Sequence, residues 1–468
     1  MKGNPVTSSP SLPDAVFKAY DIRGTVPEQI DTQFARLLGR ALALQARREG
    51  VDTLVVGYDG RLSSLELAQA LQGGINAEGI DSLDIGMVPT PLVYFGAYTQ
   101  HTGSGVAITG SHNPSNYNGF KMMMAGKTLH GAGVQELKKV MHSLDPTGEV
   151  MPGTRRSLNL IDDYVQRIAS DVALARPMKI AIDCGNGVGG AVAPQLFRAL
   201  GCEVDELYCE VDGRFPNHHP DPADPHNLQD LIRHVRETDC EIGLAFDGDA
   251  DRLGVVTKSG EIIWPDRQLI LYARDVLSRV PGATIIFDVK CSRHVAASIS
   301  AAGGQPLMWQ TGHSMIKAKL AETNAPLAGE MSGHTFFKER WYGFDDGLYT
   351  GARLLEILAR GDNPSAVLEA LPKDISTPEL KLEMQEGQPH ALIERLQAEG
   401  KFPTSESINT IDGVRAEYAD GFGLARASNT TPVVVLRFEA DSQQALDRIQ
   451  QEFRAALAPL AGEARLPF

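Results

Sequence analysis

The sequence has few cysteines, and none of them is arranged as in a disulfide framework or a zinc site. The five cysteines are an odd number and include no CxxC pair: Cys184, Cys202, Cys209, Cys240 and Cys291. Scattered thiols of this kind are typical of proteins from a reducing compartment. We therefore expect free thiols and a cytoplasmic location.

Long apolar runs and an excess of positive charge are also missing. The opening residues, MKGNPVTSSPSLPD, lack the apolar centre of a secretion signal, and no later run is long enough to span a bilayer. Lys and Arg number 44 against 59 Asp and Glu, which gives a formal net charge of −15. Because proteins bind nucleic acid by neutralising phosphates with Lys and Arg, we expect no nucleic-acid partner. Because long apolar runs are missing, we also expect no association with a membrane.

At 468 residues the chain is too long for one hydrophobic core, so several domains are expected. A short apolar run that ends in Asp occurs three times, as LVVGYD, KIAID and TIIFD, and ends at Asp59, Asp183 and Asp288. Runs rich in β-branched residues that precede helix-like stretches, such as SSLELAQALQGGINAEG, are typical of buried parallel strands in α/β layers.

Each of these runs is followed by a second apolar run that also ends in polar residues. The second runs are GVAITG before Ser111, EIGLAF before Asp247 and APLAG before Glu330. The layout predicts three similar α/β units, each with a loop at the carboxyl end of a strand, where open α/β sheets bind ligands.

The expected fold class is therefore α/β, with three similar mixed α/β domains followed by a smaller α+β C-terminal domain. The C-terminal segment INTIDGVRAEYADGFGLARASNTTPVVVLRFEA predicts strands separated by glycine turns, followed by a helix from Ser442 to Leu457. The predicted domains are residues 1–156, 157–260, 261–373 and 374–468. The first boundary rests on MHSLDPTGEVMPGTRR, residues 141–156, which we interpret as a linker, and the second on VTKSGEIIW, which predicts a hairpin near residue 260.

The first polar loop is T-G-S-H-N-P-S-N-Y-N-G-F-K, from Thr109 to Lys121. A serine after glycine at a strand end can present its hydroxyl to a cleft, although an isolated serine is more often only a turn residue. Serine is a weak nucleophile without activation, and no GxSxG elbow or Ser-His-Asp order is present, which argues against a hydrolase triad.

The second loop, D-G-D-A-D-R from Asp247 to Arg252, places three carboxylates at alternate positions after a buried strand. Like charges this close repel strongly unless a cation lies among them. Oxygen ligands favour a hard cation such as Mg²⁺, and the pattern lacks the glycine and the distant glutamate of an EF-hand calcium loop. A solvated acidic turn is the competing interpretation.

The third loop is G-E-M-S-G-H, in which Glu330 and Ser332 could together bind neighbouring sugar hydroxyls, although a plain polar turn explains it equally well. The fourth is R-A-S-N-T-T-P, from Arg426 to Pro432, whose arginine, hydroxyls and amide could hold a phosphate. Y-D-I-R-G, from Tyr20 to Gly24, adds another cationic turn.

Two other segments imitate functional motifs. Gly185, Gly187 and Gly190 match G-x-G-x-x-G, with Asp205 near the position of a ribose-binding acid, but a glycine-rich strand-to-helix turn needs no nucleotide. F-P-N-H-H-P-D-P-A-D-P-H-N, residues 215–227, has irregular spacing and four prolines, which favour a rigid polar loop over a metal cluster.

Taken in order, T-G-S-H-N-P, D-G-D-A-D-R, G-E-M-S-G-H and R-A-S-N-T-T-P resemble the motifs of the α-D-phosphohexomutase family over essentially the whole chain. The first and third motifs are most similar to the bacterial phosphomannomutase/phosphoglucomutase branch. Phosphoglucosamine mutases resemble G-E-Q-S-G-H, so Met331 argues against that branch.

The resemblance implies four domains around a central active-site cleft, in a monomer. It implies a phosphoserine at Ser111 and Mg²⁺ held by Asp247, Asp249 and Asp251 together with a phosphoryl oxygen on Ser111. It further implies that the catalytic residues include Lys121, His112, Arg23 and Arg252, and that Lys121 and His112 are the candidates for proton transfer. The sugar would be bound by Glu330, Ser332, His313, His334, Lys290 and Tyr20. The phosphate that does not react would be bound by Arg426, Ser428, Asn429 and Thr430.

The implied reaction converts a hexose 1-phosphate of glucose or mannose to the 6-phosphate through a hexose 1,6-bisphosphate, with glucose 1,6-bisphosphate as activator. Sugar phosphates are the expected partners. Phosphoglucosamine mutase and a metal-dependent sugar phosphatase remain the alternatives, and a nucleotide-dependent sugar oxidoreductase would need the Gly185 turn.

Overall fold

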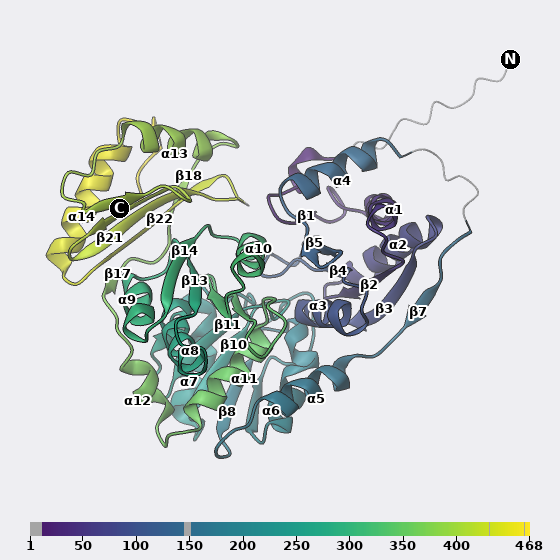
Figure 1. Ribbon diagram of the computed structural model, residues 1–468, viewed down its shortest axis with the longest axis horizontal. Helices are drawn as coiled ribbons and strands as arrows, with labels where there is room; N and C mark the ends of the chain where they lie inside the picture. Colours follow the sequence, from purple (N-terminus) through teal and green to yellow (C-terminus); the bar gives the residue numbers. More distant parts are fainter. Residues whose placement is uncertain (1–11, 145–150, 430, 463) are drawn as a thin grey trace. The chain divides into compact units, whose positions relative to one another are not determined.

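Four β-sheets carry the fold of the described residues, 12–144, 151–429, 431–462 and 464–468, in the computed structural model (Figure 1). Contacts within the chain define two units. Unit 1 comprises the described residues up to Ala173, Pro177–Leu231 and Leu244–Asp251. Unit 2 comprises Leu174–Arg176, Ile232–Gly243 and Arg252–Phe468.

The first sheet has the order β1-β5-β4-β2-β3-β7, with β6 paired to β5. Its strands are β1 (Ile22–Thr25), β2 (Thr53–Tyr58), β3 (Asp81–Met87), β4 (Gly105–Ile108), β5 (Tyr117–Met124), β6 (Lys127–Thr128) and β7 (Arg155–Ser157). Its helices are α1 (Thr32–Arg48), α2 (Ser64–Ala77), α3 (Thr90–Thr99), α4 (Ala132–His142) and α5 (Ile161–Asp171).

Alternation along β2 divides these helices between the two faces of the first sheet. Leu54 and Val56 join the core beneath α1, α2 and α4, while Val55 on the other face packs beside Gly96 of α3. Both faces are buried, as expected for strands in an α/β layer. The side chain of Asp31 caps α1 by accepting a hydrogen bond from the Phe34 N–H at 2.7 Å.

The second sheet has the order β12-β11-β10-β8-β9. Its elements are β8 (Lys179–Asp183), α6 (Ala193–Ala199), β9 (Glu203–Leu207), α7 (Gln229–Glu237), β10 (Ile242–Phe246), β11 (Leu253–Thr257) and β12 (Ile262–Ile263). The last two strands form the hairpin that the sequence predicts near residue 260.

The third sheet has the order β14-β13-β15-β16. Its strands are β13 (Thr284–Asp288), β14 (Gln305–Trp309), β15 (Leu327–Gly329) and β16 (Thr335–Phe337). The helices of this region are α8 (Pro265–Arg279), α9 (Arg293–Ala301), α10 (His313–Thr323), α11 (Gly347–Leu358) and α12 (Pro364–Glu369).

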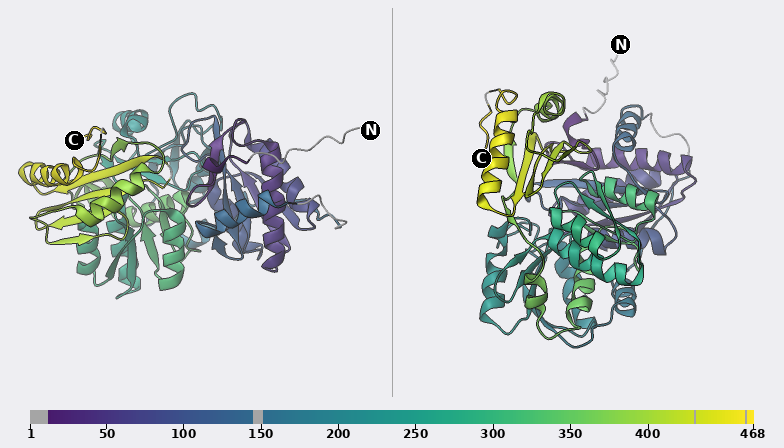
Figure 2. Two further views of the ribbon diagram at one scale, coloured as in Figure 1. Left: turned by 90° about the horizontal axis from the view of Figure 1, so that it is seen from above. Right: turned by 60° about the vertical axis from the view of Figure 1, so that its left-hand side comes forward.

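The fourth sheet has the order β17-β22-β21-β20-β19, with β18 paired to β22. Its strands are β17 (Ile375–Ser376), β18 (Leu380–Glu383), β19 (Ser407–Asn409), β20 (Val414–Tyr418), β21 (Gly421–Ala427) and β22 (Val433–Ala440). Helices α13 (Gln388–Glu399) and α14 (Gln443–Leu457) cover one face of it (Figure 2).

The first three sheets repeat one strand order, which confirms the predicted fold class of three similar α/β domains and an α+β C-terminal domain. The shared order appears as β3-β2-β4-β5, β9-β8-β10-β11 and β14-β13-β15-β16. The strand that ends in Asp lies beside the strand that precedes a polar loop in each case. β2 and β4 run parallel, as do β13 and β15, so their carboxyl ends meet at one edge.

The predicted linker at residues 141–156 is partly wrong, because both of its ends are structured. Helix α4 continues to His142, and Arg155–Ser157 pairs with β3 as strand β7. Residues 145–150 lie outside the described part of the chain. Among the described residues, no helix has the length and apolar character needed to cross a membrane.

Candidate functional site

Ser111 lies in the turn that follows β4, and its hydroxyl faces the acidic loop that follows β10. Ser111 Oγ donates a hydrogen bond to Asp247 Oδ2 at 3.0 Å, and His112 Nδ1 lies 3.2 Å from Ser111 Oγ. Ser111 is buried and has a φ of +48°, in the left-handed region that side chains rarely adopt. Holding it there costs about 1–3 kcal/mol, so the surrounding contacts must fix the turn.

Arg61 provides most of those fixing contacts. Its guanidinium donates to the backbone carbonyls of the Ser111 loop, reaching Ser111 at 2.8 Å, Asn113 at 2.6 Å, Tyr117 at 3.0 Å and also Pro114. Burial lowers the pKa of Arg61, whereas the charge of Asp59, 3.2 Å away, opposes that shift. Four loop carbonyls thus converge on one buried cation.

Asp59 holds the same loop from the end of β2. Its carboxylate accepts hydrogen bonds from Thr109 Oγ1 at 2.8 Å and from the Gly110 N–H at 3.2 Å. Asp288, at the end of β13, accepts similarly from the Met331 N–H at 3.1 Å in the third polar loop. Asp183 differs, because it pairs with His218 at 3.0 Å. In the first and third sheets, the repeated Asp is therefore an anchor for the neighbouring loop.

The three carboxylates of the D-G-D-A-D loop converge as the sequence predicts. One oxygen from each of Asp247, Asp249 and Asp251 lies within 4.8 Å of the others, and all three side chains are fully buried. Asp249 Oδ1 is buried and has no hydrogen-bond partner among the described residues. A buried carboxylate oxygen without a donor is costly, so this group fits a cation of the hard, oxygen-binding class.

Lys121 on β5 balances part of this charge. Its ammonium lies 2.7 Å from Asp249 Oδ2 and 2.5 Å from Asp251 Oδ2, and Thr90 Oγ1 donates to Asp249 Oδ2 at 2.6 Å. Burial and Asp251 act to raise the pKa of Asp249, but Lys121 and the hydrogen bonds outweigh them, so the pKa lies below its usual value. Three carboxylates and one ammonium leave a formal charge of −2, which one divalent cation would balance.

The glycine between the first two carboxylates permits the close approach of the two loops. A Cβ at Gly248 would lie 2.2 Å from the Ser111 carbonyl oxygen, far inside van der Waals contact. The second and third carboxylates are separated by Ala250, whose φ is +58°. The alternation of acid and small residue in the sequence therefore reflects packing as well as charge.

Unit 2 assembles a second polar group around the G-E-M-S-G-H loop. Glu330 Oε1 accepts a hydrogen bond from the Gly312 N–H at 2.6 Å, and Glu330 Oε2 lies 3.2 Å from His334 Nδ1. Burial opposes ionisation of Glu330, but His334 and the Gly312 N–H outweigh it and lower the pKa. Ser332 Oγ lies 3.1 Å from His334 Nδ1. Glu330 and Ser332 therefore meet at one histidine nitrogen.

His334 also connects this loop to two other predicted residues of unit 2. Its ring stacks on His313 with centroids 5.6 Å apart, and Arg252 Nε lies 3.3 Å from His334 Nε2. Behind them, the buried carboxylate of Asp345 lies 3.4 Å from His313 and 2.8 Å from Lys317. The sequence reasoning missed Asp345, which sits in the loop between β16 and α11.

Arg426 on β21 is joined to the same group through Asp412. Asp412 Oδ2 accepts from Arg426 Nε at 3.0 Å and from the Thr311 N–H at 2.9 Å, next to Gly312. Lys290, after β13, pairs with Glu379 at 2.7 Å. Ser428 and Asn429 follow β21, and Thr430 lies outside the described residues.

The predicted site residues thus fall into two groups, one in each unit. Unit 1 brings together Ser111, His112, Lys121, Asp247, Asp249 and Asp251, with Arg23 reaching Asn113 of the serine loop at 2.9 Å and Tyr20 lying just before β1. Unit 2 holds Arg252, Lys290, His313, Glu330, Ser332, His334, Arg426, Ser428 and Asn429.

Sequence reasoning missed the supporting residues of unit 1. Arg61 follows the strand-ending Asp59 by two positions, Thr90 begins α3 after a proline, and His219 donates to the His112 carbonyl. Only Arg61 had a usable signal, a basic residue two positions after the repeated Asp. Its partners are carbonyls about fifty residues away, which no local pattern encodes.

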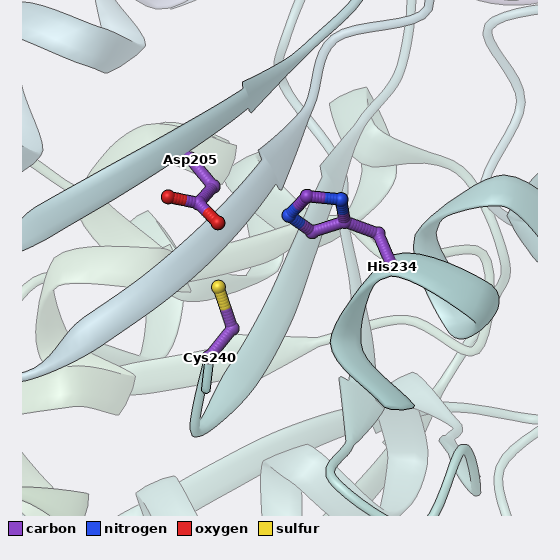
Figure 3. A group of neighbouring side chains, drawn as sticks. All are labelled: Asp205, His234 and Cys240. Atoms are coloured by element: carbon purple, nitrogen blue, oxygen red, sulfur yellow. The ribbon is translucent and has the colours of Figure 1, made fainter. Parts of the chain in front are cut away.

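The glycines of G-N-G-V-G-G serve packing, as the sequence interpretation favoured. A Cβ at Gly190 would lie 1.9 Å from the Cys209 carbonyl oxygen, and Asp205 lies in the middle of β9, 3.8 Å from Lys179. Figure 3 shows Asp205, together with His234 of α7 and Cys240 before β10. Asp205 belongs to unit 1 and the other two to unit 2, and none of them belongs to either group of predicted site residues.

Comparison with known proteins identifies the family. The chain matches four domains described as phosphoglucomutase/phosphomannomutase: the α/β/α domains I, II and III over residues 14–147, 162–260 and 264–375, and the C-terminal domain over 379–456. These matches span most of the chain.

Individual relatives agree with this result. A phosphoglucomutase of Neisseria gonorrhoeae is 55% identical over 448 residues, covering 96% of this chain and 97% of that protein. A phosphomannomutase/phosphoglucomutase of Pseudomonas aeruginosa is 51% identical over 461 residues, covering 98% of this chain and 99% of that protein. A crystal structure of a phosphoglucomutase/phosphomannomutase family protein from Burkholderia thailandensis has a TM-score of 0.93 at 55% identity, covering 98% of this chain and all of that one.

The chain therefore belongs to the phosphoglucomutase/phosphomannomutase family of α-D-phosphohexomutases. The resemblance predicted from the four motifs is confirmed.

The role of Arg61 can be tested by replacing it with methionine, which keeps its length and removes its charge. Removing one partner of a buried ion pair should destabilise unit 1 by about 3–5 kcal/mol. We expect a lower unfolding temperature by calorimetry and faster hydrogen exchange in peptides covering Thr109–Lys121.

Arg214→Met is the matched control, because Arg214 also pairs with an aspartate but its side chain is 73% exposed. The free energy of unfolding of this variant should stay within about 0.5 kcal/mol of that of the unchanged protein. Equal effects of the two substitutions on the Ser111 loop would contradict the role given to Arg61.

Proposed function

We propose that Ser111 carries the phosphoryl group in the reversible conversion of a hexose 1-phosphate to a hexose 6-phosphate. The enzyme class itself follows from the family, since relatives that align with nearly the whole chain are phosphoglucomutases and phosphomannomutases. The observation that carries the proposal is the Ser111 hydroxyl, which lies 3.0 Å from a carboxylate of the buried acidic group whose ligand set fits a cation.

Asp247, Asp249 and Asp251 would hold Mg²⁺ together with a phosphoryl oxygen on Ser111. The bound ion would neutralise charge on the phosphoryl group during transfer. Oxygen-only ligands, the formal charge of −2 and the buried Asp249 Oδ1 all fit such a cation. Lys121 would keep the carboxylates ionised and close together.

In the first step, the free hydroxyl of the hexose 1-phosphate attacks the phosphorus of phosphorylated Ser111. The new O–P bond forms as the Ser111 Oγ–P bond breaks, the sugar hydroxyl loses its proton, and Ser111 Oγ regains one. His112 has the better geometry of the two candidates for proton exchange at Ser111, because its Nδ1 lies 3.2 Å from Oγ while Lys121 is held by two carboxylates. The product of this step is a hexose 1,6-bisphosphate.

The bisphosphate then turns end for end and returns its other phosphoryl group to Ser111. Glu330 and Ser332 would bind the two sugar hydroxyls that roughly exchange places in this turn. Glu330 supports this role, because its buried carboxylate has a lowered pKa and is therefore an anionic hydrogen-bond acceptor, with His334 Nδ1 lying 3.2 Å from Oε2. His313, His334, Lys290 and Tyr20 complete the proposed sugar site, while Arg23 and Arg252 would stabilise charge during transfer.

Arg426, Ser428, Asn429 and Thr430 would hold the phosphate that does not react. Glucose 1,6-bisphosphate would restore the phosphoserine after loss of an intermediate and thus act as an activator. We further propose a cytoplasmic location, which the five free thiols support, and no nucleic-acid partner, which the net charge of −15 supports. The monomeric state is proposed from the family resemblance. The proposed domains remain residues 1–156, 157–260, 261–373 and 374–468.

The reaction can be followed by ³¹P NMR with glucose 1-phosphate or mannose 1-phosphate, MgCl₂ and a trace of glucose 1,6-bisphosphate. We expect the 1-phosphate resonance to be replaced by a 6-phosphate resonance without release of inorganic phosphate. Stoichiometric inorganic phosphate would instead indicate a phosphatase. Conversion of glucosamine 1-phosphate alone would indicate the phosphoglucosamine branch.

The proposed phosphate site predicts a defect in binding when Arg426 is replaced by alanine. Loss of a charge-assisted hydrogen bond of about 1.5–3 kcal/mol should raise KM roughly 10- to 100-fold for the hexose 1-phosphate. Steady-state kinetics with Arg395→Ala as control would test this, because Arg395 is an exposed arginine of the same C-terminal region. Unchanged KM in Arg426→Ala would remove Arg426 from the site.

A further inference from the structure

Two thiols of unit 1 lie next to each other, beside the turn that packs against the D-G-D-A-D loop. Cys184 follows β8 directly, and Cys209 follows the neighbouring parallel strand β9 by two residues. Their sulfur atoms are 3.6 Å apart, with the Cys209 thiol donating toward Cys184. Cys184 is fully buried, whereas Cys209 is partly exposed. Neither thiol has a role in the reaction proposed above.

The turn that begins at Cys184 supports the D-G-D-A-D loop. The Val188 N–H donates a hydrogen bond to the Gly248 carbonyl at 3.1 Å. A Cβ at Gly189 would lie 3.1 Å from the Ala250 Cβ and 3.7 Å from the Cys184 sulfur. The turn is therefore packed between the thiol pair on one side and the proposed metal ligands on the other.

We propose that Cys184 and Cys209 form a reversible disulfide when the protein meets a hydroperoxide, and that this bond weakens cation binding by the D-G-D-A-D loop. The second half of the inference rests on the proposed function, because it takes that loop to be the metal site. The first half concerns only the two thiols. Disulfides that form in reducing compartments are usually transient and serve redox sensing or catalysis. Two adjacent free thiols that take no part in the proposed reaction fit redox sensing.

The order of oxidation follows from exposure and acidity. Hydrogen bonding with the Cys209 thiol and burial both raise the pKa of Cys184 well above its usual range, so Cys184 stays protonated. The partly exposed Cys209 sulfur attacks the hydroperoxide, its proton is transferred to the departing oxygen, and a sulfenic acid and an alcohol (or water) form. The Cys184 sulfur then attacks the Cys209 sulfur, the S–O bond breaks, and hydroxide leaves with the Cys184 proton as water. In total, two thiols lose two electrons and two protons, and the hydroperoxide is reduced.

The bond requires a small but consequential movement. A disulfide has an S–S length near 2.05 Å, so the sulfurs must approach by roughly 1.5 Å. The Cys184 sulfur lies 3.7 Å from where a Cβ on Gly189 would be, and the Ala250 Cβ lies 3.1 Å from the same point, so movement of the sulfur would disturb the packing between the thiol pair and the D-G-D-A-D loop. Well-packed interiors transmit such shifts because they contain few voids. The carboxylate geometry of the loop should therefore change.

The disulfide can be detected by mass spectrometry after treatment with tert-butyl hydroperoxide, alkylation of remaining thiols and trypsin digestion. Trypsin separates the two cysteines into the peptides Ile180–Arg198 and Ala199–Arg214. We expect these peptides to be linked, two hydrogen masses lighter than their sum, and to separate on reduction with dithiothreitol. Because the second peptide also contains Cys202, the variant Cys202→Ser must keep the link and Cys209→Ser must lose it.

The coupling to the loop is measured by calorimetric titration with MgCl₂, without substrate. Changes behind metal ligands typically alter metal affinity 10- to 100-fold, so we expect the oxidised protein to bind Mg²⁺ about tenfold more weakly or worse. Cys209→Ser should show the affinity of the reduced protein before and after treatment, and Cys202→Ser should respond like the unchanged protein.

Each failure has a distinct meaning. No linked peptide, or a link that survives in Cys209→Ser, would overturn the disulfide. A linked protein with unchanged Mg²⁺ affinity would overturn the coupling. Absence of Mg²⁺ binding in the reduced protein would contradict the proposed metal site and the coupling with it, while the linked peptides would still decide whether the thiol pair is an oxidation site.

Discussion

Three carboxylates that must share one buried point set the main physical constraint on this protein. Asp247, Asp249 and Asp251 have no solvent exposure, yet their oxygens lie within 4.8 Å of one another. Repulsion at such distances is strong in a medium that screens poorly, so the arrangement persists only if positive charge is brought to it. Lys121 supplies one charge from β5, and the remaining negative charge is what makes the loop suited to a divalent ion. The serine loop is built against this acidic loop, and its strained turn is held by Arg61 and Asp59.

The repeated strand order explains how one architecture serves three loops. In the first and third sheets, an aspartate at the end of one strand binds backbone of the loop that follows the adjacent parallel strand. The loop is thereby fixed at the carboxyl edge, where ligands of α/β sheets bind. The second sheet uses its aspartate differently, pairing Asp183 with His218, and its loop carries the carboxylates themselves. The same strand order therefore carries a loop of different chemistry in each of the three sheets.

Periodicity and strand-end residues were enough to predict the three α/β layers, the hairpin near residue 260 and the final helix, which was expected from Ser442 to Leu457 and extends from Gln443 to Leu457. They also favoured convergence of Asp247, Asp249 and Asp251 around a cation over a solvated acidic turn, because the loop leaves a buried strand, and the three carboxylates do converge. Arg61, Thr90 and Asp345 could not be predicted, since their importance lies in partners distant in sequence. The linker at 141–156 was only partly correct, because Arg155–Ser157 pairs with β3 at the edge of the first sheet. This pairing is a tertiary contact, and the turn-rich composition of the segment gives no sign of it.

The central claim is that the phosphoryl group passes through Ser111, and it is tested most directly by locating that group on the chain. The purified protein is incubated with ³²P-labelled glucose 1,6-bisphosphate and MgCl₂, digested with trypsin, and the peptide Leu62–Lys121 is sequenced by mass spectrometry. The account predicts one labelled phosphoryl group, on Ser111, which leaves the protein when unlabelled hexose phosphate is added. Label on another residue, or turnover of hexose phosphate by a chain whose Ser111 is never labelled, would contradict it.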